Sequence, residues 1–343
     1  MQLSNRFKYW QWRVIICSMI GYAMFYFVRK NFSFAIPLLN DEYGISNASF
    51  GIIMTFGGLI YGVSKFVNGI LADRTNARWH LVVGLSVCVL TSVLFGFADR
   101  ISTFFTGTSE GEGFIRGMVI VMAALYILNQ IFQGCGFAPC NHLMVSWVPP
   151  KELATKMSIW NTSHSVGAFI VAVICGYITR WQLCFWIPAA IAFVGIFFIV
   201  ITLRDTPKSV GLPELPKVEG ELDEEQQKEP KVFRQFLMKK VFLNPVIWIL
   251  AISGFLIYGP QALLGVTAAN IATKKAASSA VGLIGFMSYL STIITGVGFG
   301  YLADRFGGWE WIFITMGGLA VVGTVLILSI WGISEGNGNI ETK

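Results

Sequence analysis

Charge is the property that this sequence has least of. Only 13% of its 343 residues are charged, about half of the roughly 25% that is usual in soluble domains, whereas 55% are hydrophobic. A chain of this composition has too little polar surface to coat a water-soluble globule, which excludes an ordinary cytosolic enzyme and a disordered protein. We expect no nucleic-acid partner either, although the net charge is +6.

The residues that most often build catalytic and metal sites are also few. The sequence has six cysteines and three histidines, and six cysteines in a chain of this length are too few for a disulfide scaffold. Cys135, Cys140 and His142 are close in sequence, but they lack a zinc-site spacing and a fourth ligand. No nucleophile–base pair emerges either. We therefore expect no catalytic residue, no metal and no cofactor, and hence no enzyme.

Long apolar runs fill most of the chain. A membrane-crossing helix needs about 20 mostly apolar residues, and the number of such runs predicts an all-α membrane protein. Continuous runs of this length exclude a β-barrel, whose strands alternate over about 10 residues. The nine candidate spans are residues 14–39, 50–72, 80–98, 118–146, 157–179, 183–203, 245–272, 277–302 and 309–332.

The basic residues between the spans indicate the orientation, because cytoplasmic loops carry an excess of Lys and Arg. Seven basic residues precede the first span, follow the second or separate the fourth from the fifth, against three in the alternate loops. This asymmetry predicts a multi-pass protein of the cell membrane, surrounded by the lipid bilayer, with a cytoplasmic N-terminus. The seven are Arg6, Lys8, Arg13, Arg74, Arg78, Lys151 and Lys156.

Polar residues recur inside the spans with a period of three. The first and second spans contain Arg29 and Lys65, and the fourth and fifth contain Gln133 and His164, whereas the third and sixth contain no Asn, Gln or charge. A charge at mid-membrane costs at least about 2.5 kcal/mol, so such side chains face protein or a water-filled cavity. Spans three and six can then face lipid, which predicts a six-helix 3+3 bundle of the major facilitator type.

A short motif at the end of the second span recurs late in the chain. One interpretation is a helix end with a solvated ion pair; the other is a conformational-switch loop, since the first copy resembles the loop motif of the major facilitator superfamily. The two copies are Gly69-Ile-Leu-Ala-Asp73-Arg74 and Gly300-Tyr-Leu-Ala-Asp304-Arg305.

Three spans carry polar and aromatic residues at helical spacing. The i, i+4, i+7 spacing places Tyr22, Tyr26 and Arg29 on one face of the first span. Two cations, a histidine and aromatics with few intramembrane acids predict an anionic ligand, and arginine suits a phosphoryl group because its guanidinium forks onto two oxygens. The candidate binding residues are Arg29, Lys65, His164, Tyr22, Tyr26, Tyr61, Trp160 and Asn161.

Plainer interpretations of the same residues remain open. The tyrosines and His164 also fit helix packing, and Lys65 also fits a side chain that reaches the membrane surface. Asn129 and Gln133 fit hydrogen bonds between helices. Tyr258 and Gln261 form a further polar pair in the seventh span, although Pro260 between them disfavours a regular helix.

Several of these segments together resemble one family, the organophosphate:phosphate antiporters of the major facilitator superfamily. The family contains hexose-phosphate, glycerol-3-phosphate and phosphoglycerate transporters and a related hexose-phosphate sensor. The segments that carry the resemblance are Tyr22-x-x-Phe-Tyr26-Phe-Val-Arg29-Lys30-Asn31-Phe, Tyr61-Gly-Val-Ser-Lys65-Phe, Gln133-Gly-x-Gly-Phe-Ala-Pro139-Cys140, Trp160-Asn161-Thr-Ser-His164-Ser-Val-Gly, Arg204-Asp205-Thr-Pro207 and Gly254-Phe-Leu-Ile-Tyr258-Gly259-Pro260-Gln261.

The resemblance implies roles for the candidate residues. Arg29 matches one of two phosphate-clamping arginines of the family, and Lys65 and His164 match a substrate-site lysine and histidine. The aromatic candidates line the pocket in the family. The implied mechanism is alternating access that exchanges inorganic phosphate for a sugar phosphate or glycerol phosphate, and Gly259-Pro260-Gln261 favours the hexose-phosphate branch.

The chain departs from the family in its second half. The family has twelve spans in two six-helix halves, whereas this chain has six spans plus about three, as if an internal segment were deleted. The second clamping arginine is missing, since no arginine lies between Arg234 and Arg305. We expect a six-helix half (1–203), a charged cytoplasmic linker (204–243), a shortened membrane half (244–335) and a polar tail (336–343).

The span count also conflicts with the resemblance. With nine spans, the loop that carries Lys274 and Lys275 falls outside the cell, whereas the corresponding family loop is cytoplasmic. Either the later spans insert against the positive-inside preference, or the segment 245–272 does not cross the membrane as one helix.

Three functions fit these observations. The first is a secondary antiporter that exchanges an organophosphate, hexose 6-phosphate favoured, for inorganic phosphate. The second is a membrane sensor that binds a sugar phosphate and signals to a histidine kinase. The third is an inactive remnant of the transporter, which the missing arginine favours.

Overall fold

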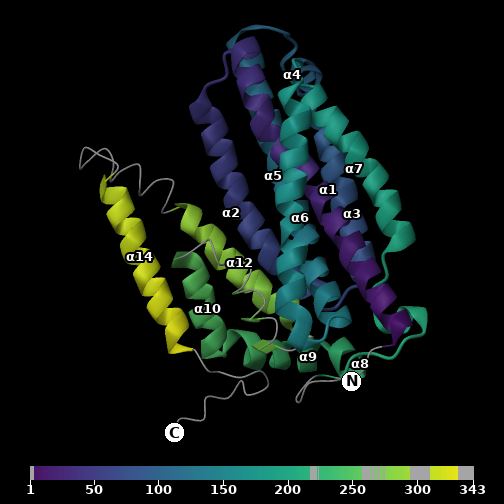
Figure 1. Ribbon diagram of the computed structural model, residues 1–343. Coiled ribbons are helices and arrows are strands. Elements are labelled where there is room, and N and C mark those ends of the chain that lie inside the picture. The colour runs from purple at the N-terminus through teal and green to yellow at the C-terminus, as the bar shows by residue number, and fades with distance from the viewer. Residues whose placement is uncertain are drawn as a thin grey trace.

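The computed structural model describes residues 4–216, 222, 224–256, 264, 267–268, 271–272, 275–293 and 310–330. The N-terminal part is a bundle of long helices that lie side by side with similar axis directions (Figure 1). Six of the described helices are long and apolar enough to cross a membrane. They are α1 (Asn5–Tyr43), α2 (Asn47–Ala72), α3 (Ala77–Phe95), α5 (Gly111–Trp147), α6 (Pro150–Gly176) and α7 (Leu183–Thr202), and a short helix, α4 (Ala98–Thr106), follows α3.

Polar residues at the helix ends explain where several helices begin and stop. Ser4, Ser46 and Asn76 each precede a helix, and their side-chain oxygens accept a hydrogen bond from a backbone amide of the first turn. Gly44 ends α1 in the left-handed conformation, at φ 65°, which a residue without Cβ adopts at little cost. The helices α1 and α5 are longer than the predicted spans 14–39 and 118–146, because polar residues on either side of the apolar run are also helical.

Buried amides tie these helices together. Asn129 on α5 donates to Thr91 Oγ1 on α3 at 2.8 Å, and Gln133 Nε2 donates to the backbone oxygen of Phe25 on α1 at 3.1 Å. These contacts place both residues in helix packing. The outer helices α3 and α7 expose apolar side chains such as Leu90 and Phe197, as the apolar composition of spans three and six predicts. Every regular element in the described ranges is helical, with six long helices first, as predicted.

The C-terminal part is shorter and less regular. Two small helices, η1 (Pro207–Val210) and α8 (Glu224–Lys228), lead to α9 (Pro230–Leu237) and the π-helical turn η2 (Met238–Phe242). Three apolar helices follow: α10 (Pro245–Leu256), α12 (Ala277–Ile293) and α14 (Glu310–Ser329). The helix α12 packs against α2 and α5, α10 packs against α12, and α14 packs against α10.

The part of the expected seventh span (residues 245–272) that the structure describes as a continuous helix is α10. The helix α10 has 12 residues, which is about 18 Å at 1.5 Å per residue and too short for a hydrocarbon core of about 30 Å. The chain is back at the same end of the bundle by Lys275, which lines a cavity together with Asp73 and Arg74 of the α2–α3 loop. A nine-span arrangement would place Lys275 at the opposite end, so this position favours the alternative in which segment 245–272 does not cross the membrane as one helix. The span count stays a prediction.

Candidate functional site

Arg29 lies in the middle of the bundle among three tyrosine rings. Its guanidinium carbon is 3.8 Å from the ring centre of Tyr61 and 5.6 Å from that of Tyr26. Its Nη2 donates a hydrogen bond of 3.0 Å to the hydroxyl of Tyr289 on α12. The helical spacing predicts that Tyr26 and Arg29 share a face, and the facing helix α2 supplies Tyr61. A guanidinium group placed over the face of an aromatic ring is attracted by that ring, and this attraction stabilises the half-buried cation.

Lys65 is the second cation of this cluster and is 5% exposed. Its ammonium lies 4.0 Å from the ring centre of Phe137 and 5.7 Å from that of Tyr289. The side chain passes Gly285 on α12, where an added Cβ would lie 2.6 Å from Lys65 Cδ. Lys65 and Arg29 thus meet around one ring, although they come from different helices.

Aromatic contacts close the cluster on its other side. Phe137 packs on Trp160 at 5.7 Å, Trp160 stacks on Tyr22 at 4.9 Å, and Tyr22 contacts Tyr26 at 5.4 Å. The indole of Trp160 donates to Ser18 Oγ, which fixes its orientation. A continuous circuit of rings and cations therefore links α1, α2, α5, α6 and α12.

His164 lies at the edge of this circuit. Its ring centre is 5.5 Å from that of Tyr26, and it is half-buried. Asn161 follows Trp160 on the same helix and is half-buried. Asn68 points away from the cluster, because its amide contacts Ser64 and the ring of His80.

Two residues of the cluster were not predicted. Tyr289 contacts both cations, and Phe137 contacts Lys65. The sequence signal for Tyr289 was that it places a hydroxyl-bearing ring within the apolar run 277–302. No sequence signal pointed to Phe137 beyond its place in the fourth-span motif. Tyr258 and Gln261 lie outside the described residues.

The electrostatics of the cluster favour an anion. The ion pairs found within the described part of the chain are Arg116–Glu112, His142–Asp73 and Lys156–Glu152. None of them involves Arg29 or Lys65, and the contacts of these two intramembrane cations among the described residues are with aromatic rings and one hydroxyl. A ligand with two negative charges and several acceptor oxygens matches this arrangement.

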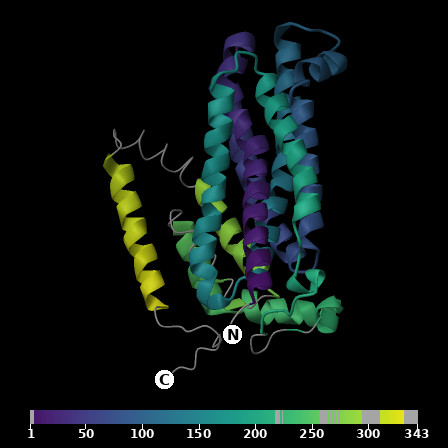
Figure 2. The same cartoon turned by 45° about the vertical axis from the view of Figure 1, so that its right-hand side comes forward.

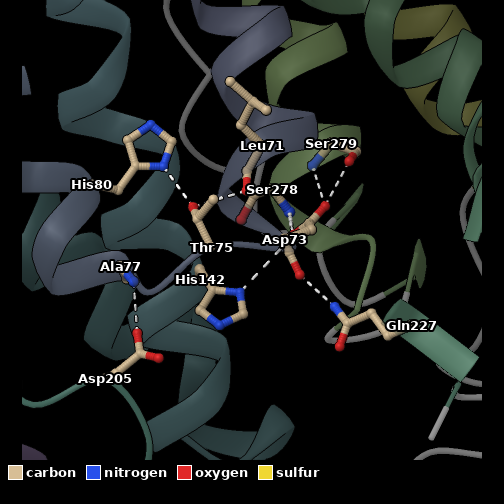
Figure 3. Close-up of polar contacts among 10 residues, drawn as sticks. All are labelled: Leu71, Asp73, Thr75, Ala77, His80, His142, Asp205, Gln227, Ser278 and Ser279. Carbon is tan, nitrogen blue, oxygen red and sulfur yellow. Dashed lines mark hydrogen bonds and ion pairs between the residues drawn. The ribbon is translucent and has the colours of Figure 1, made fainter. Parts of the chain in front are cut away.

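A second polar site lies at the end of the bundle, around Asp73 (Figure 3). The side chain of Asp73 is fully buried, and its oxygens accept hydrogen bonds from the amides of Ser278 and Ser279 and from the Ser279 hydroxyl, at 3.0, 2.9 and 2.6 Å. A carboxylate at the N-terminus of a helix is stabilised by free amides and the helix dipole. Asp73 therefore caps α12 from another helix, so the interpretation as a solvated ion pair is wrong.

The surroundings of Asp73 join three segments that are distant in sequence. Gln227 of α8 donates to the backbone oxygen of Asp73, and the ring of His142 on α5 lies 4.0 Å from its carboxylate. Gly69 allows the close crossing of α2 and α12, since an added Cβ there would lie 2.5 Å from the backbone oxygen of Ser278. The guanidinium of Arg74 lies over the ring of Phe233 on α9. Gly300, Asp304 and Arg305, the second copy of the motif, lie outside the described residues.

Comparison with known proteins agrees with this architecture. The Major Facilitator Superfamily matches residues 18–269, which is more than half of the chain. The chain belongs to the Major Facilitator Superfamily. Within it, the chain is similar to the organophosphate:phosphate antiporters, and it is a multi-pass membrane protein.

Three relatives illustrate the similarity. A probable hexose phosphate transport protein of Chlamydia trachomatis is 25% identical over 446 residues, covering 97% of this chain and 93% of the relative. The glycerol-3-phosphate transporter of Bacillus subtilis is 26% identical, covering 97% and 95%. The membrane sensor protein UhpC of Escherichia coli is 30% identical, covering 77% of this chain and 57% of the sensor. Because the first alignment is much longer than this 343-residue chain, a long stretch of that relative has no counterpart here, as an internal deletion predicts.

Solved structures confirm the fold. The proton:xylose symporter XylE matches with a TM-score of 0.59 at 10% identity, covering 97% of this chain and 98% of the symporter. The transporter FucP in its outward conformation matches with a TM-score of 0.55 at 12% identity, covering 92% and 98%. At this identity the likeness concerns the fold alone.

Proposed function

We propose that this chain is a secondary transporter that exchanges a phosphorylated sugar or glycerol phosphate, with hexose 6-phosphate favoured, for inorganic phosphate by alternating access. The observation that carries the proposal is the pair of cations, Arg29 and Lys65, which lie around the ring of Tyr289 without a carboxylate partner among the described residues. A phosphate dianion supplies the charge that this pair lacks.

Each part of the cluster has a role in this proposal. The fork of Arg29 binds two phosphate oxygens, and the ammonium of Lys65 adds a third charge-assisted contact. His164, at the edge, donates a hydrogen bond to the phosphate or to the sugar. Tyr22, Tyr26, Tyr61 and Trp160 form the walls, where their faces suit the apolar face of a sugar ring.

The hydroxyl of Tyr289 connects ligand binding to helix movement. This hydroxyl accepts a hydrogen bond from Arg29 Nη2, so a phosphate that takes this donor competes with Tyr289. Because Tyr289 belongs to α12 and Arg29 to α1, the competition changes a contact between the two parts of the chain. Phosphate and organophosphate compete for the same cations, which is the basis of exchange rather than of one-way flux.

The test is exchange of labelled inorganic phosphate in proteoliposomes loaded with unlabelled phosphate or hexose 6-phosphate. We expect saturable exchange, and we expect Arg29→Lys to weaken phosphate binding roughly 10- to 100-fold, because a point charge cannot replace two parallel hydrogen bonds. The matched control is Arg13→Lys, which lies outside the cluster next to Trp10. Unchanged affinity in Arg29→Lys would contradict the clamp.

A sensor is the second candidate, favoured by the 30% identity to a membrane sensor. Folded, monodisperse protein that binds hexose 6-phosphate through Arg29 but exchanges no phosphate would support it, and would direct the search to a histidine kinase partner. Protein that neither binds nor exchanges would indicate an inactive, internally deleted remnant.

A further inference from the structure

The segment before α10 changes its charge abruptly. Residues 214–229 contain seven Asp or Glu, whereas residues 230–303 contain none. Four basic residues follow Pro230 within the next ten positions. This basic surface consists of Lys231, Arg234, Lys239 and Lys240.

The structure places this basic surface on one side of an amphipathic helix. On α9 and η2, Phe233, Phe236 and Val241 are buried, and they belong to the apolar cluster that α10 and α12 share. Lys231, Arg234 and Lys239 are exposed, and Lys240 is half-buried. Figures 1 and 2 both show α9 lying across the end of the bundle near α10.

The four cations have no acidic partner within the part of the chain that the structure describes, where the ion pairs lie elsewhere. Apolar side chains are exposed directly beside them: Met238 is 42% and Leu243 is 70% exposed. A helix with a charged face and neighbouring exposed apolar residues is typical of segments that lie at a membrane surface.

The bend between η2 and α10 indicates where the chain passes from the membrane surface into the bilayer. The helix pair Pro230–Phe242 and Pro245–Leu256 is bent by 59°, and Asn244 caps α10 through the amide of Val246. Trp248, one turn into α10, is 37% exposed and donates to the backbone oxygen of Phe242. Tryptophan is enriched at the boundary between lipid and water, so the chain turns from the surface into the bilayer between Phe242 and Trp248.

We propose that Lys231, Arg234, Lys239 and Lys240 form a binding surface for the phosphate headgroups of anionic phospholipids, with Met238 and Leu243 inserted among the adjacent acyl chains. Clusters of basic residues next to a membrane span attract anionic lipids, and the attraction falls off within a Debye length. The surface is independent of the Arg29 cluster and needs no exchange activity.

The test uses the full chain with Leu243→Cys labelled by a bimane fluorophore, since the native cysteines are all buried. The protein is reconstituted in phosphatidylcholine containing an equal fraction of either brominated phosphatidylglycerol or brominated phosphatidylcholine, both of which quench the label on contact. We expect the brominated phosphatidylglycerol to quench the label at least about twofold more strongly than the brominated phosphatidylcholine does. We expect this preference to disappear at high salt.

Three further variants keep the test decisive. A variant in which all four cations are changed to glutamine should lose the preference; its substitutions are Lys231→Gln, Arg234→Gln, Lys239→Gln and Lys240→Gln. A variant in which the three lysines are changed to arginine should keep the preference. Phe197→Cys on α7, an exposed apolar position remote from α9, should show no preference. Equal quenching by the two lipids, a preference that survives in the glutamine variant, or a label that neither lipid reaches because the acidic linker covers it would each overturn the proposal.

Discussion

Lys65 reaches Phe137 because the facing position on α12 has no side chain. An added Cβ at Gly285 would lie 2.6, 2.7 and 3.0 Å from Lys65 Cδ, Cε and Nζ. These atoms belong to a flexible chain that can turn aside, unlike a backbone. At the neighbouring Gly282 an added Cβ would instead meet backbone atoms of α2, namely Lys65 O at 3.0 Å and Phe66 Cα at 3.3 Å.

Gly285→Ala should therefore move the Lys65 ammonium without unfolding the protein. We expect a roughly tenfold weaker phosphate affinity, about 1.4 kcal/mol, with a small change in thermal stability. Titration of phosphate binding and a melting curve in detergent measure the two quantities.

Double substitution separates displacement of Lys65 from general damage. If Gly285→Ala acts through Lys65, adding it to Lys65→Ala should cause no further loss of affinity. Gly282→Ala is the contrasting variant and should lower the melting temperature because helix backbones must separate. A further loss in the double variant would show that Gly285 acts on another part of the site.

At the scale of elements, α12 begins where Asp73 of the α2–α3 connection supplies its cap. A helix start normally finds its cap one residue before it in sequence, but the amides of Ser278 and Ser279 bond to a carboxylate more than 200 residues away. The packing of α12 on α2 and the formation of its first turn are therefore coupled. Movement of α2 against α12 would have to break these bonds.

Asp73→Asn should loosen the start of α12. An amide keeps one acceptor oxygen but loses the charge that the helix N-terminus favours, so we expect a loss of about 1–2 kcal/mol. Hydrogen exchange at Ser278 and Ser279 should become faster, while exchange in α3 should not change.

Asp205→Asn is the control, because Asp205 Oδ1 also accepts from the start of a helix distant in sequence, the amide of Ala77 on α3 at 2.7 Å, next to the local cap Asn76. It should loosen α3 and leave α12 protected. Unchanged exchange at Ser278 in Asp73→Asn would mean that α12 is held by packing alone.

At the scale of the whole molecule, the return of the chain between α10 and α12 decides the topology. Lys275 lies beside Arg74 and Thr75 in one cavity of about 410 Å³, so these residues share one side of the membrane. The positive-inside preference assigns that side to the cytoplasm, together with the N-terminus, and this assignment stays a prediction.

Cysteine labelling in inverted and right-side-out vesicles tests the arrangement. Lys275→Cys should react from the same side as Thr75→Cys, and Phe104→Cys on α4, which is exposed at the other end of the bundle (Figure 1), should react from the opposite side. Reaction of Lys275→Cys together with Phe104→Cys would restore the nine-span count.

The local pattern of the sequence predicted the features that depend on residues within a single helix: where a helix forms and which side chains share one face. Apolar runs longer than a membrane is thick must become helices there, because the bilayer leaves no other partner for backbone amides. Helical spacing likewise placed Tyr22, Tyr26 and Arg29 on one face, and the structure brings them together with Tyr61 and Lys65. The roles of these residues in binding stay predictions.

Composition and spacing by themselves thus determined a helical membrane protein, and the first six of the nine predicted spans are long apolar helices in the structure; the anion-binding role of the cluster stays a prediction. Only the tertiary structure decided that Tyr289 joins the two cations, that Asp73 caps α12, and that Lys275 lies beside the α2–α3 loop. These three features depend on contacts between segments far apart in the chain, where the free energy comes from packing and capping between helices, which no local pattern encodes.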